Sequence, residues 1–338
     1  MWTEEKLNEI LTTPSNQLIE DMKKIPGDIT VLGAGGKMGP TLCVLAKKAA
    51  KLAGIEKRII AVSRFSEESV ATYLRENGVE IISADLLDAQ QLAALPETEN
   101  VIFMAGKKFG TDGNESLTWA MNASLPAFVA QKYKGSNIVV FSSGNIYPIV
   151  PLSYGGCTES DRPAPIGEYA MSCLARERAF EYAANAYGTK VFIYRLNFSV
   201  DLRYGVLFDV AKKVLDGTPI SLTTPCYNFI WQGSANEIAI RGLLHAGSPA
   251  VKMNVTGPET VSVRFVAQQF ANSFGKEAIF ENEEGNTAYL NNAMQAMEAF
   301  GYPSVSASQL IRWQAEYILD GGRTLDKPTH FEERKGSY

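Results

Sequence analysis

The sequence predicts an α/β fold with a doubly wound parallel sheet and a smaller C-terminal lobe. Six short apolar runs alternate with longer amphipathic stretches, the pattern of a parallel sheet covered by helices. A glycine-rich turn follows the first run, and the length of 338 residues exceeds the usual size of one core. Together these observations indicate a Rossmann-type domain with an attached lobe. The expected strands are 29–32, 59–62, 79–82, 101–104, 138–141 and 191–194.

Three parts are expected along the chain. Residues 1–26 form a helical extension, in which Ser15 is a suitable N-cap before an apolar stripe with helical spacing. Residues 27–200 carry the six strands and form the Rossmann-type domain. Beyond Asn197 prolines punctuate short elements. Residues 201–338 are therefore expected to form mainly a substrate-binding lobe, with about 226–250 returning to the first domain.

Composition and charge restrict the class of partner. Hydrophobic residues make up 46% and charged residues 20%, so the whole chain is expected to fold. The net charge is −5 without any Lys/Arg block, which argues against a nucleic-acid or anionic-membrane surface and favours a small-molecule partner. The chain has no apolar run of roughly 20 residues and no basic-then-apolar leader, so a cytoplasmic protein without a membrane span is expected. Four scattered cysteines and two histidines predict neither a disulfide scaffold nor a metal site.

The glycine turn predicts a dinucleotide site. The first strand runs into Gly33-Ala34-Gly35-Gly36-Lys37-Met38-Gly39, and Pro40 suits the first turn of the helix that follows. Glycines allow a tight turn and let the backbone approach a pyrophosphate, which the free N–H groups of the helix then bind. We expect Gly33, Gly36, Lys37, Met38 and Gly39 to contact the cofactor.

The end of the second strand bears on the choice of cofactor. An NAD enzyme would place Asp or Glu there for the ribose hydroxyls, whereas this chain has Ser63 and Arg64. A hydroxyl and a guanidinium suit a 2′-phosphate, so NADP is favoured and NAD is the alternative. An arginine that stacks on adenine or lies in solvent would fit the same residues.

The spacing G-x-x-G-x-x-G resembles that of short-chain dehydrogenases/reductases, and several ordered motifs over about residues 28–320 extend the resemblance to the extended members of that family. It implies that Asp85 and Leu86 contact adenine, that Ala105 and Gly106 form a small-residue loop beside the cofactor, and that Asn122 in the next helix also belongs to the cofactor site. The stretch from Ser142 to Tyr147 is similar to the family's S-S-x-x-x-Y, and a T-E, proline-rich segment leads to Tyr169. The resemblance implies that Ser143 and Tyr169 are the catalytic pair and that Tyr169 and Asn197 also contact the cofactor.

The same resemblance implies a class of substrate and an oligomeric state. The motifs are closest to those of the NAD-dependent epimerases and dehydratases, so hydride transfer on a nucleotide sugar or a related sugar or polyol is expected. Asn145, Asn197 and Arg203 are candidate substrate residues. Members of the family commonly pair through two helices, which would here start near Glu115 and Tyr169, so a homodimer is expected.

One position departs from the family pattern. The signature Y-x-x-x-K reads Tyr169-Ala170-Met171-Ser172-Cys173, so a thiol replaces the lysine whose charge lowers the pKa of the tyrosine. Lys107 or Lys108 could supply another cation. Alternatively, the enzyme is slow or altered, or the protein is a dinucleotide-binding sensor or regulatory module without turnover. Because Ser143, Tyr169 and Asn197 are all retained, we favour an enzyme.

Overall fold

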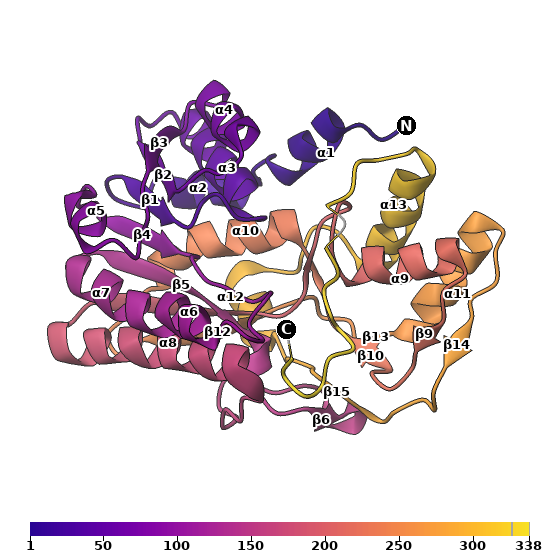
Figure 1. Ribbon diagram of the computed structural model, residues 1–338. Helices are drawn as coiled ribbons and strands as arrows, with labels where there is room; N and C mark the ends of the chain where they lie inside the picture. The colour runs from indigo at the N-terminus through magenta and orange to yellow at the C-terminus, as the bar shows by residue number, and fades with distance from the viewer. Residues whose placement is uncertain (326, 338) are drawn as a thin grey trace.

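The computed structural model describes residues 1–325 and 327–337 and shows two lobes, the larger of which is built around one large sheet (Figure 1). The sheet has seven parallel strands in the order β12-β7-β5-β4-β1-β2-β3. Its strands are β1 (Ile29–Leu32), β2 (Ile59–Ser63), β3 (Glu80–Ser83), β4 (Asn100–Phe103), β5 (Asn137–Ser143), β7 (Lys190–Leu196) and β12 (Val251–Val255). The order reverses between β1 and β4, which is the topological switch point where such sheets bind dinucleotides. The fold class predicted from the sequence is confirmed.

Helices cover both faces of the sheet. Side chains alternate along each strand, so Val31 of β1 enters the core with α3 (Gly39–Leu52), whereas Leu32 enters the core with α7 (Leu125–Lys132) and α8 (Gly167–Tyr187). Burial on both faces explains why these strands read as continuous apolar runs. The remaining helices near the sheet are α2 (Asn16–Met22), α4 (Glu68–Glu76), α5 (Ala89–Ala94), α6 (Glu115–Trp119), α10 (Gln232–Arg241) and α12 (Met294–Phe300).

The smaller lobe has its own core. Buried side chains of α9 (Val206–Asp216), α11 (Val263–Phe274) and α13 (Ala307–Leu319) pack together in it. Figure 1 places these helices on the side away from α4 and α5, and short strands that pair two by two lie in the segments around them. The short strands are β6 (Val150–Pro151), β8 (Ser199–Val200), β9 (Ile220–Ser221), β10 (Cys226–Tyr227), β11 (Ile230–Trp231), β13 (Val261–Ser262), β14 (Phe280–Glu281) and β15 (Thr287–Ala288). Among the described residues there are also the π-helical turn η1 (Ala120–Ser124) and the 3-10 turns η2 (Gly144–Ile146), η3 (Leu152–Tyr154) and η4 (Gly242–His245).

The N-terminal extension links the two lobes. The Ser15 hydroxyl accepts the backbone N–H of Leu18 and caps α2, as its position in the sequence indicates. Leu18 and Met22 of α2 pack in the core shared with α3. The preceding helix α1 (Glu4–Leu11) instead inserts Leu7 into the core of the smaller lobe. The extension therefore contributes to both cores.

The seventh strand, β12, was not predicted. It pairs with β7 at the edge of the sheet, and its residues Val251 and Lys252 are only partly buried. In its sequence Lys252 and Asn254 alternate with apolar residues, so β12 lacks the continuous apolar run by which the central strands were predicted. The helix α10 returns from the smaller lobe to pack on α3, directly before this strand.

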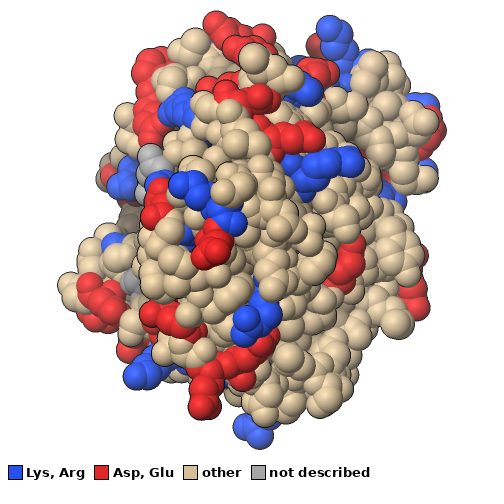
Figure 2. All heavy atoms as spheres, turned by 90° about the vertical axis from the view of Figure 1, so that its right-hand side faces the viewer, with Lys and Arg blue, Asp and Glu red and all other residues tan. Residues whose placement is uncertain are grey.

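The surface carries interspersed charges. On the face shown in Figure 2, Lys and Arg side chains lie among Asp and Glu in small groups of both signs. Within residues 1–325 and 327–337, no helix is both long and apolar enough to cross a membrane. Over the same residues, no three His, Cys, Asp or Glu side chains come together as a set of metal ligands.

Candidate active site

The glycine loop between β1 and α3 forms a cradle that tolerates side chains at some positions and excludes them at others. Gly33 has a φ of +89°, and a Cβ there would lie 2.5 Å from the backbone nitrogen of Ala105. A Cβ on Gly39 would overlap the backbone of Ala34. At Gly36, in contrast, the nearest atom to such a Cβ is the Gly33 oxygen at 3.6 Å, so the space above this residue is open. An exposed glycine facing open space before a helix N-terminus fits a bound pyrophosphate.

Lys37 of the same loop reaches the smaller lobe. Its ammonium lies 3.1 Å from the ring centroid of Tyr204 and 4.8 Å from that of Phe109. Burial, together with the charges of Lys327 and Lys108, lowers the pKa of Lys37 to about 7. The loop is thus joined to both lobes by one side chain. The next residue, Met38, packs against the core that α3 shares with the sheet.

The predicted adenosine residues lie together at the ends of β2 and β3. Ser63 stands beside the glycine loop, since a Cβ on Gly35 would lie 2.5 Å from its hydroxyl oxygen. The Arg64 guanidinium is 76% exposed and lies 3.9 Å from the Asp85 carboxylate. Leu86 is buried. A weak, exposed ion pair leaves the guanidinium free to turn toward another anion.

Tyr169 and Ser143 meet at the carboxyl edge of the sheet, as the resemblance implies. Ser143 is the last residue of β5 and Tyr169 lies in the first turn of α8, and their side chains are hydrogen-bonded. The Ser143 hydroxyl also donates to the Asn145 side-chain oxygen at 3.0 Å. Burial raises the pKa of Tyr169 well above its usual value, and the Arg176 charge and the Ser143 hydrogen bond act in the opposite direction. The tyrosine therefore needs a cation to work as a base near neutral pH.

Cys173 occupies the position of the usual lysine and is fully buried. Its thiol is hydrogen-bonded to Tyr169, and burial raises the pKa of that thiol, so it stays neutral. The cations expected to replace the lysine lie in the loop after β4. The Lys108 ammonium is 5.7 Å from the ring centroid of Tyr169, whereas the backbone N–H and carbonyl of Lys107 are bound by the Asn122 side chain. Burial lowers the pKa of Lys108 to about 8, so its charge is present below that pH and is lost above it.

A buried arginine that the sequence analysis did not single out lies in the same place. Arg176 is 6% exposed and donates to the Phe141 carbonyl and to the Asn122 side-chain oxygen, both at 2.7 Å. A Cβ on Gly106 would overlap the Arg176 guanidinium, so this side chain lies directly beneath the loop predicted to line the cofactor. Asn122 itself belongs to the π-helical turn η1, and such turns are frequent at functional sites. The sequence did contain a signal for this arginine: Tyr169, Cys173 and Arg176 are four and three residues apart, which places them on one face of a helix.

The candidate substrate residues divide into two groups. Asn145 lies beside Ser143, and Asn197 at the end of β7 donates to the Asn228 side chain at 2.7 Å. Asn145 therefore borders the catalytic pair, and Asn197 follows β7, the strand that pairs with β5. Arg203 instead pairs with Asp201 at 2.6 Å and lies 3.6 Å from Glu4. Because these two carboxylates already neutralise its guanidinium, Arg203 is not part of the substrate site that we propose.

The C-terminal segment reaches this site from the smaller lobe. The Lys108 ammonium donates to the Thr329 carbonyl at 3.4 Å, and the rings of Phe109 and His330 are 5.9 Å apart. The backbone of Gly336 touches Gly167, two residues before Tyr169. Nothing in the sequence pattern indicated this approach, because these contacts join residues more than 160 positions apart.

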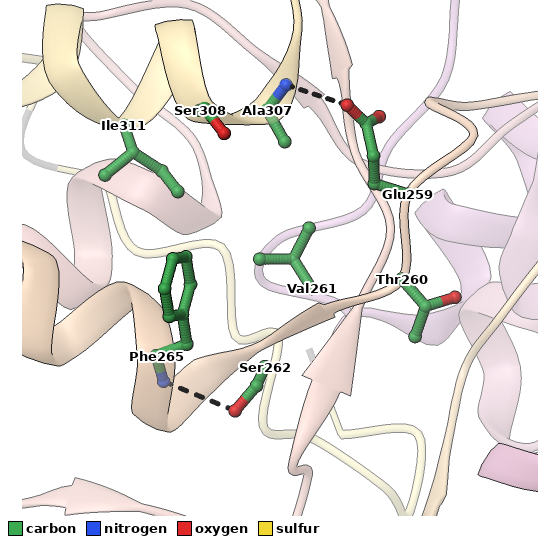
Figure 3. A pocket seen from close by; sticks show the side chains of 8 residues that line it. All are labelled: Glu259, Thr260, Val261, Ser262, Phe265, Ala307, Ser308 and Ile311. Carbon is green, nitrogen blue, oxygen red and sulfur yellow. Dashed lines mark hydrogen bonds between the residues drawn. The ribbon is translucent and has the colours of Figure 1, made fainter.

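A shallow groove of about 300 Å³ lies elsewhere, between β13, α11 and the start of α13 (Figure 3). Val261, Phe265 and Ile311 surround it, and the dashed bonds in Figure 3 are helix-end contacts of Phe265 and Ala307. No residue predicted for the cofactor or the substrate lines this groove. The arrangement around Tyr169 is therefore the candidate active site.

The fold, the glycine cradle and the paired Ser143 and Tyr169 define an extended short-chain dehydrogenase/reductase. The model of the NAD dependent epimerase/dehydratase family matches residues 29–224, and the chain belongs to that family. It is an enzyme of this type, and its residues fit a nicotinamide dinucleotide. No curated protein matches the chain.

Solved structures share the fold over most of the chain. UDP-glucose 4-epimerase of Thermus thermophilus, in complex with NAD, has a TM-score of 0.68 at 20% identity, covering 86% of this chain and 99% of that one. UDP-glucuronic acid 4-epimerase of Bacillus cereus, also with NAD, has a TM-score of 0.70 at 17% identity over 87% and 99%. UDP-glucose 4-epimerase of Thermotoga maritima, with UDP-glucose, has a TM-score of 0.69 at 16% identity over 87% and 99%.

Proposed function

We propose that this enzyme transfers hydride between a nicotinamide dinucleotide and the sugar of a nucleotide sugar, as an epimerase, a dehydratase or an oxidoreductase. The observation that carries the proposal is the hydrogen-bonded pair of Ser143 and Tyr169 at the carboxyl edge of the sheet, where only β4 separates β5 from β1 and its glycine cradle. When bound, the nicotinamide supplies or accepts the hydride. Ser143 then hydrogen-bonds the reacting sugar oxygen, and Tyr169 gives or takes its proton.

Two observations support a nucleotide sugar as the substrate: the similarity to solved structures and the asparagine side chains near the catalytic pair. Several solved relatives carry UDP-sugars in their names. In this chain the Asn145 side chain lies next to Ser143 and the Asn197 side-chain oxygen lies beside Gly144, with Asn228 bonded to Asn197 behind it; amides suit the hydroxyls and phosphates of such a ligand. Asn228 is itself held by the Asn291 carbonyl at 2.7 Å, which fixes its orientation.

The experiment is a substrate panel followed by proton NMR. The protein is incubated with UDP-glucose or UDP-glucuronic acid and either dinucleotide, with glucose 1-phosphate as the control that lacks uridine. Conversion of the UDP-sugar to an epimer, a dehydrated or an oxidised product supports the proposal. Cofactor affinity without turnover across nucleotide sugars, sugar acids and polyols would favour a dinucleotide-binding regulatory protein instead.

NADP is the cofactor we propose, because Arg64 is exposed beside Ser63 at the end of β2. Arg64→Ala is expected to weaken NADPH binding by about tenfold or more and NADH binding much less, since only NADPH carries a 2′-phosphate for the guanidinium to clamp. Fluorescence titration of both reduced cofactors measures the two affinities. Arg58→Ala is the matched control, because Arg58 precedes the same strand at its opposite end and pairs with Glu80. Equal losses for both cofactors would indicate adenine stacking.

A homodimer is also proposed, in which each subunit contributes two helices to a four-helix interface: the continuous helix formed by α6, η1 and α7, and the helix α8. Large apolar side chains are exposed on these helices, including Phe128 and Tyr182 at 63% each. Light scattering at micromolar concentration should give a dimer for the native chain and a monomer for Phe128→Glu, which places a charge in the apolar face. Phe265→Glu on α11 is the control, since Phe265 is 48% exposed in the smaller lobe. A native monomer would contradict the proposal.

A further inference from the structure

Arg176 stands on the same helix face as the catalytic tyrosine. Tyr169, Cys173 and Arg176 are spaced four and three residues apart in α8, so their side chains follow one another along one stripe. Side chains on a helix lean toward its N-terminus, which directs Arg176 back toward Tyr169. The charge that the family places at the position of Cys173 is therefore present one turn later.

The contacts of Arg176 hold its guanidinium in a fixed place. One nitrogen donates to the carbonyl of Phe141 in β5 and another to Asn122 in η1, and the group lies 5.6 Å from the ring centroid of Phe103. Its Nε has no hydrogen-bond partner within residues 1–325 and 327–337. A buried donor without a partner is costly, and Gly106 beside it leaves no room for a side chain. This cation is thus desolvated, immobile and adjacent to the cofactor loop.

Two cations face Tyr169, and they differ in chemistry. Lys108 approaches the tyrosine ring from the loop after β4, and its ammonium loses its proton around pH 8. A guanidinium remains charged throughout the physiological range. Two further ionisable groups of α8 lie close by: Cys173, which is hydrogen-bonded to Tyr169 and stays neutral, and Glu177, which is paired with Arg195 at 2.7 Å. Arg176 is therefore the permanent positive charge at this site.

We propose that Arg176 is a positioning residue that replaces the family's lysine: its fixed charge, one turn after Cys173, stabilises the tyrosinate form of Tyr169. This inference rests on the acid–base role proposed for Tyr169. It predicts that the charge can be moved between positions 173 and 176 without loss of function. It also explains how the site retains Ser143 and Tyr169 although the usual lysine is absent.

The test is a charge-relocation series measured by the pH–rate profile. Arg176→Met should move the rising limb upward by at least one pH unit, which is about a tenfold loss of turnover at a pH on that limb. Arg176→Lys and the double variant Cys173→Lys/Arg176→Met should move it back toward the native position. Arg178→Met is the matched control, because Arg178 is 53% exposed on the same helix and pairs with Glu181. An unshifted limb in Arg176→Met, or a double variant no better than Arg176→Met, would overturn the proposal.

A second readout does not need turnover. ¹³Cζ-tyrosine NMR of the cofactor-free protein, with Tyr169→Phe to assign the resonance, reports the pKa of Tyr169 directly. That pKa should rise by at least one unit in Arg176→Met and stay unchanged in Arg178→Met. An unchanged pKa in a folded Arg176→Met protein rejects this inference while leaving the proposed reaction intact. If Arg176→Met does not fold, the single variant Cys173→Lys decides. A shift of the rising limb, or of the Tyr169 pKa, to lower pH by two units or more in Cys173→Lys would mean that the native site has no effective cation and would overturn the proposal.

Discussion

Tyr169→Phe is expected to lower turnover of a nucleotide sugar by about 10²-fold or more while cofactor affinity changes little. The hydroxyl of Tyr169 is hydrogen-bonded to Ser143 and is the group placed to exchange a proton with the sugar oxygen. Phenylalanine removes this hydroxyl but keeps the ring that packs beside Cys173 in the local apolar cluster. Steady-state kinetics and a fluorescence titration of the reduced cofactor separate the two effects.

The control for this substitution is Tyr187→Phe, at the other end of the same helix. Tyr187 is 45% exposed and contacts the ring of Tyr182, so loss of its hydroxyl should leave turnover unchanged. Equal activity of Tyr169→Phe and the native protein on an identified substrate would show that another group moves the proton.

Gly36→Val is expected to abolish dinucleotide binding and to leave the fold nearly as stable as before. A Cβ at Gly36 meets only the Gly33 oxygen, at 3.6 Å, and φ is not positive there, so the folded chain accommodates the side chain. The branched valine would instead occupy the space in which the pyrophosphate approaches the helix N-terminus. Fluorescence titration with reduced cofactor measures binding, and thermal unfolding measures stability.

Two other glycines make this result interpretable. Gly135→Val is the matched control, because Gly135 is exposed after α7 with no atom within 4 Å of a Cβ, and binding should be retained. Gly33→Val should destabilise the protein itself, since Gly33 has a positive φ and lies against Ala105. Retention of native cofactor affinity by Gly36→Val would contradict the dinucleotide site.

The central strands were predictable because they are buried on both faces. Ile29–Leu32 and its neighbours read as uninterrupted apolar runs, and five further strands were placed to within two residues. β12 escaped because Lys252 and Asn254 interrupt its apolar residues, and the short strands of the smaller lobe, such as β10, have two residues each and no detectable period. The hydrophobic periodicity of a strand is therefore hard to detect where polar residues interrupt it or where the strand has only two residues.

The sequence by itself determined the parts of the site that depend on local backbone geometry. A glycine turn between a strand and a helix carries its chemistry wherever such a unit occurs, whereas Ser143 and Tyr169 were predicted from motifs that resemble those of the family. It also showed that Cys173 removes the usual cation. Only the tertiary structure decided what lies around that position: Arg176 beneath Gly106, Lys108 beside Tyr169, and the C-terminal segment against both. The physical reason is that the energy of a charge depends on its distance from Tyr169 and on its burial, and these are set by contacts between elements far apart in the chain.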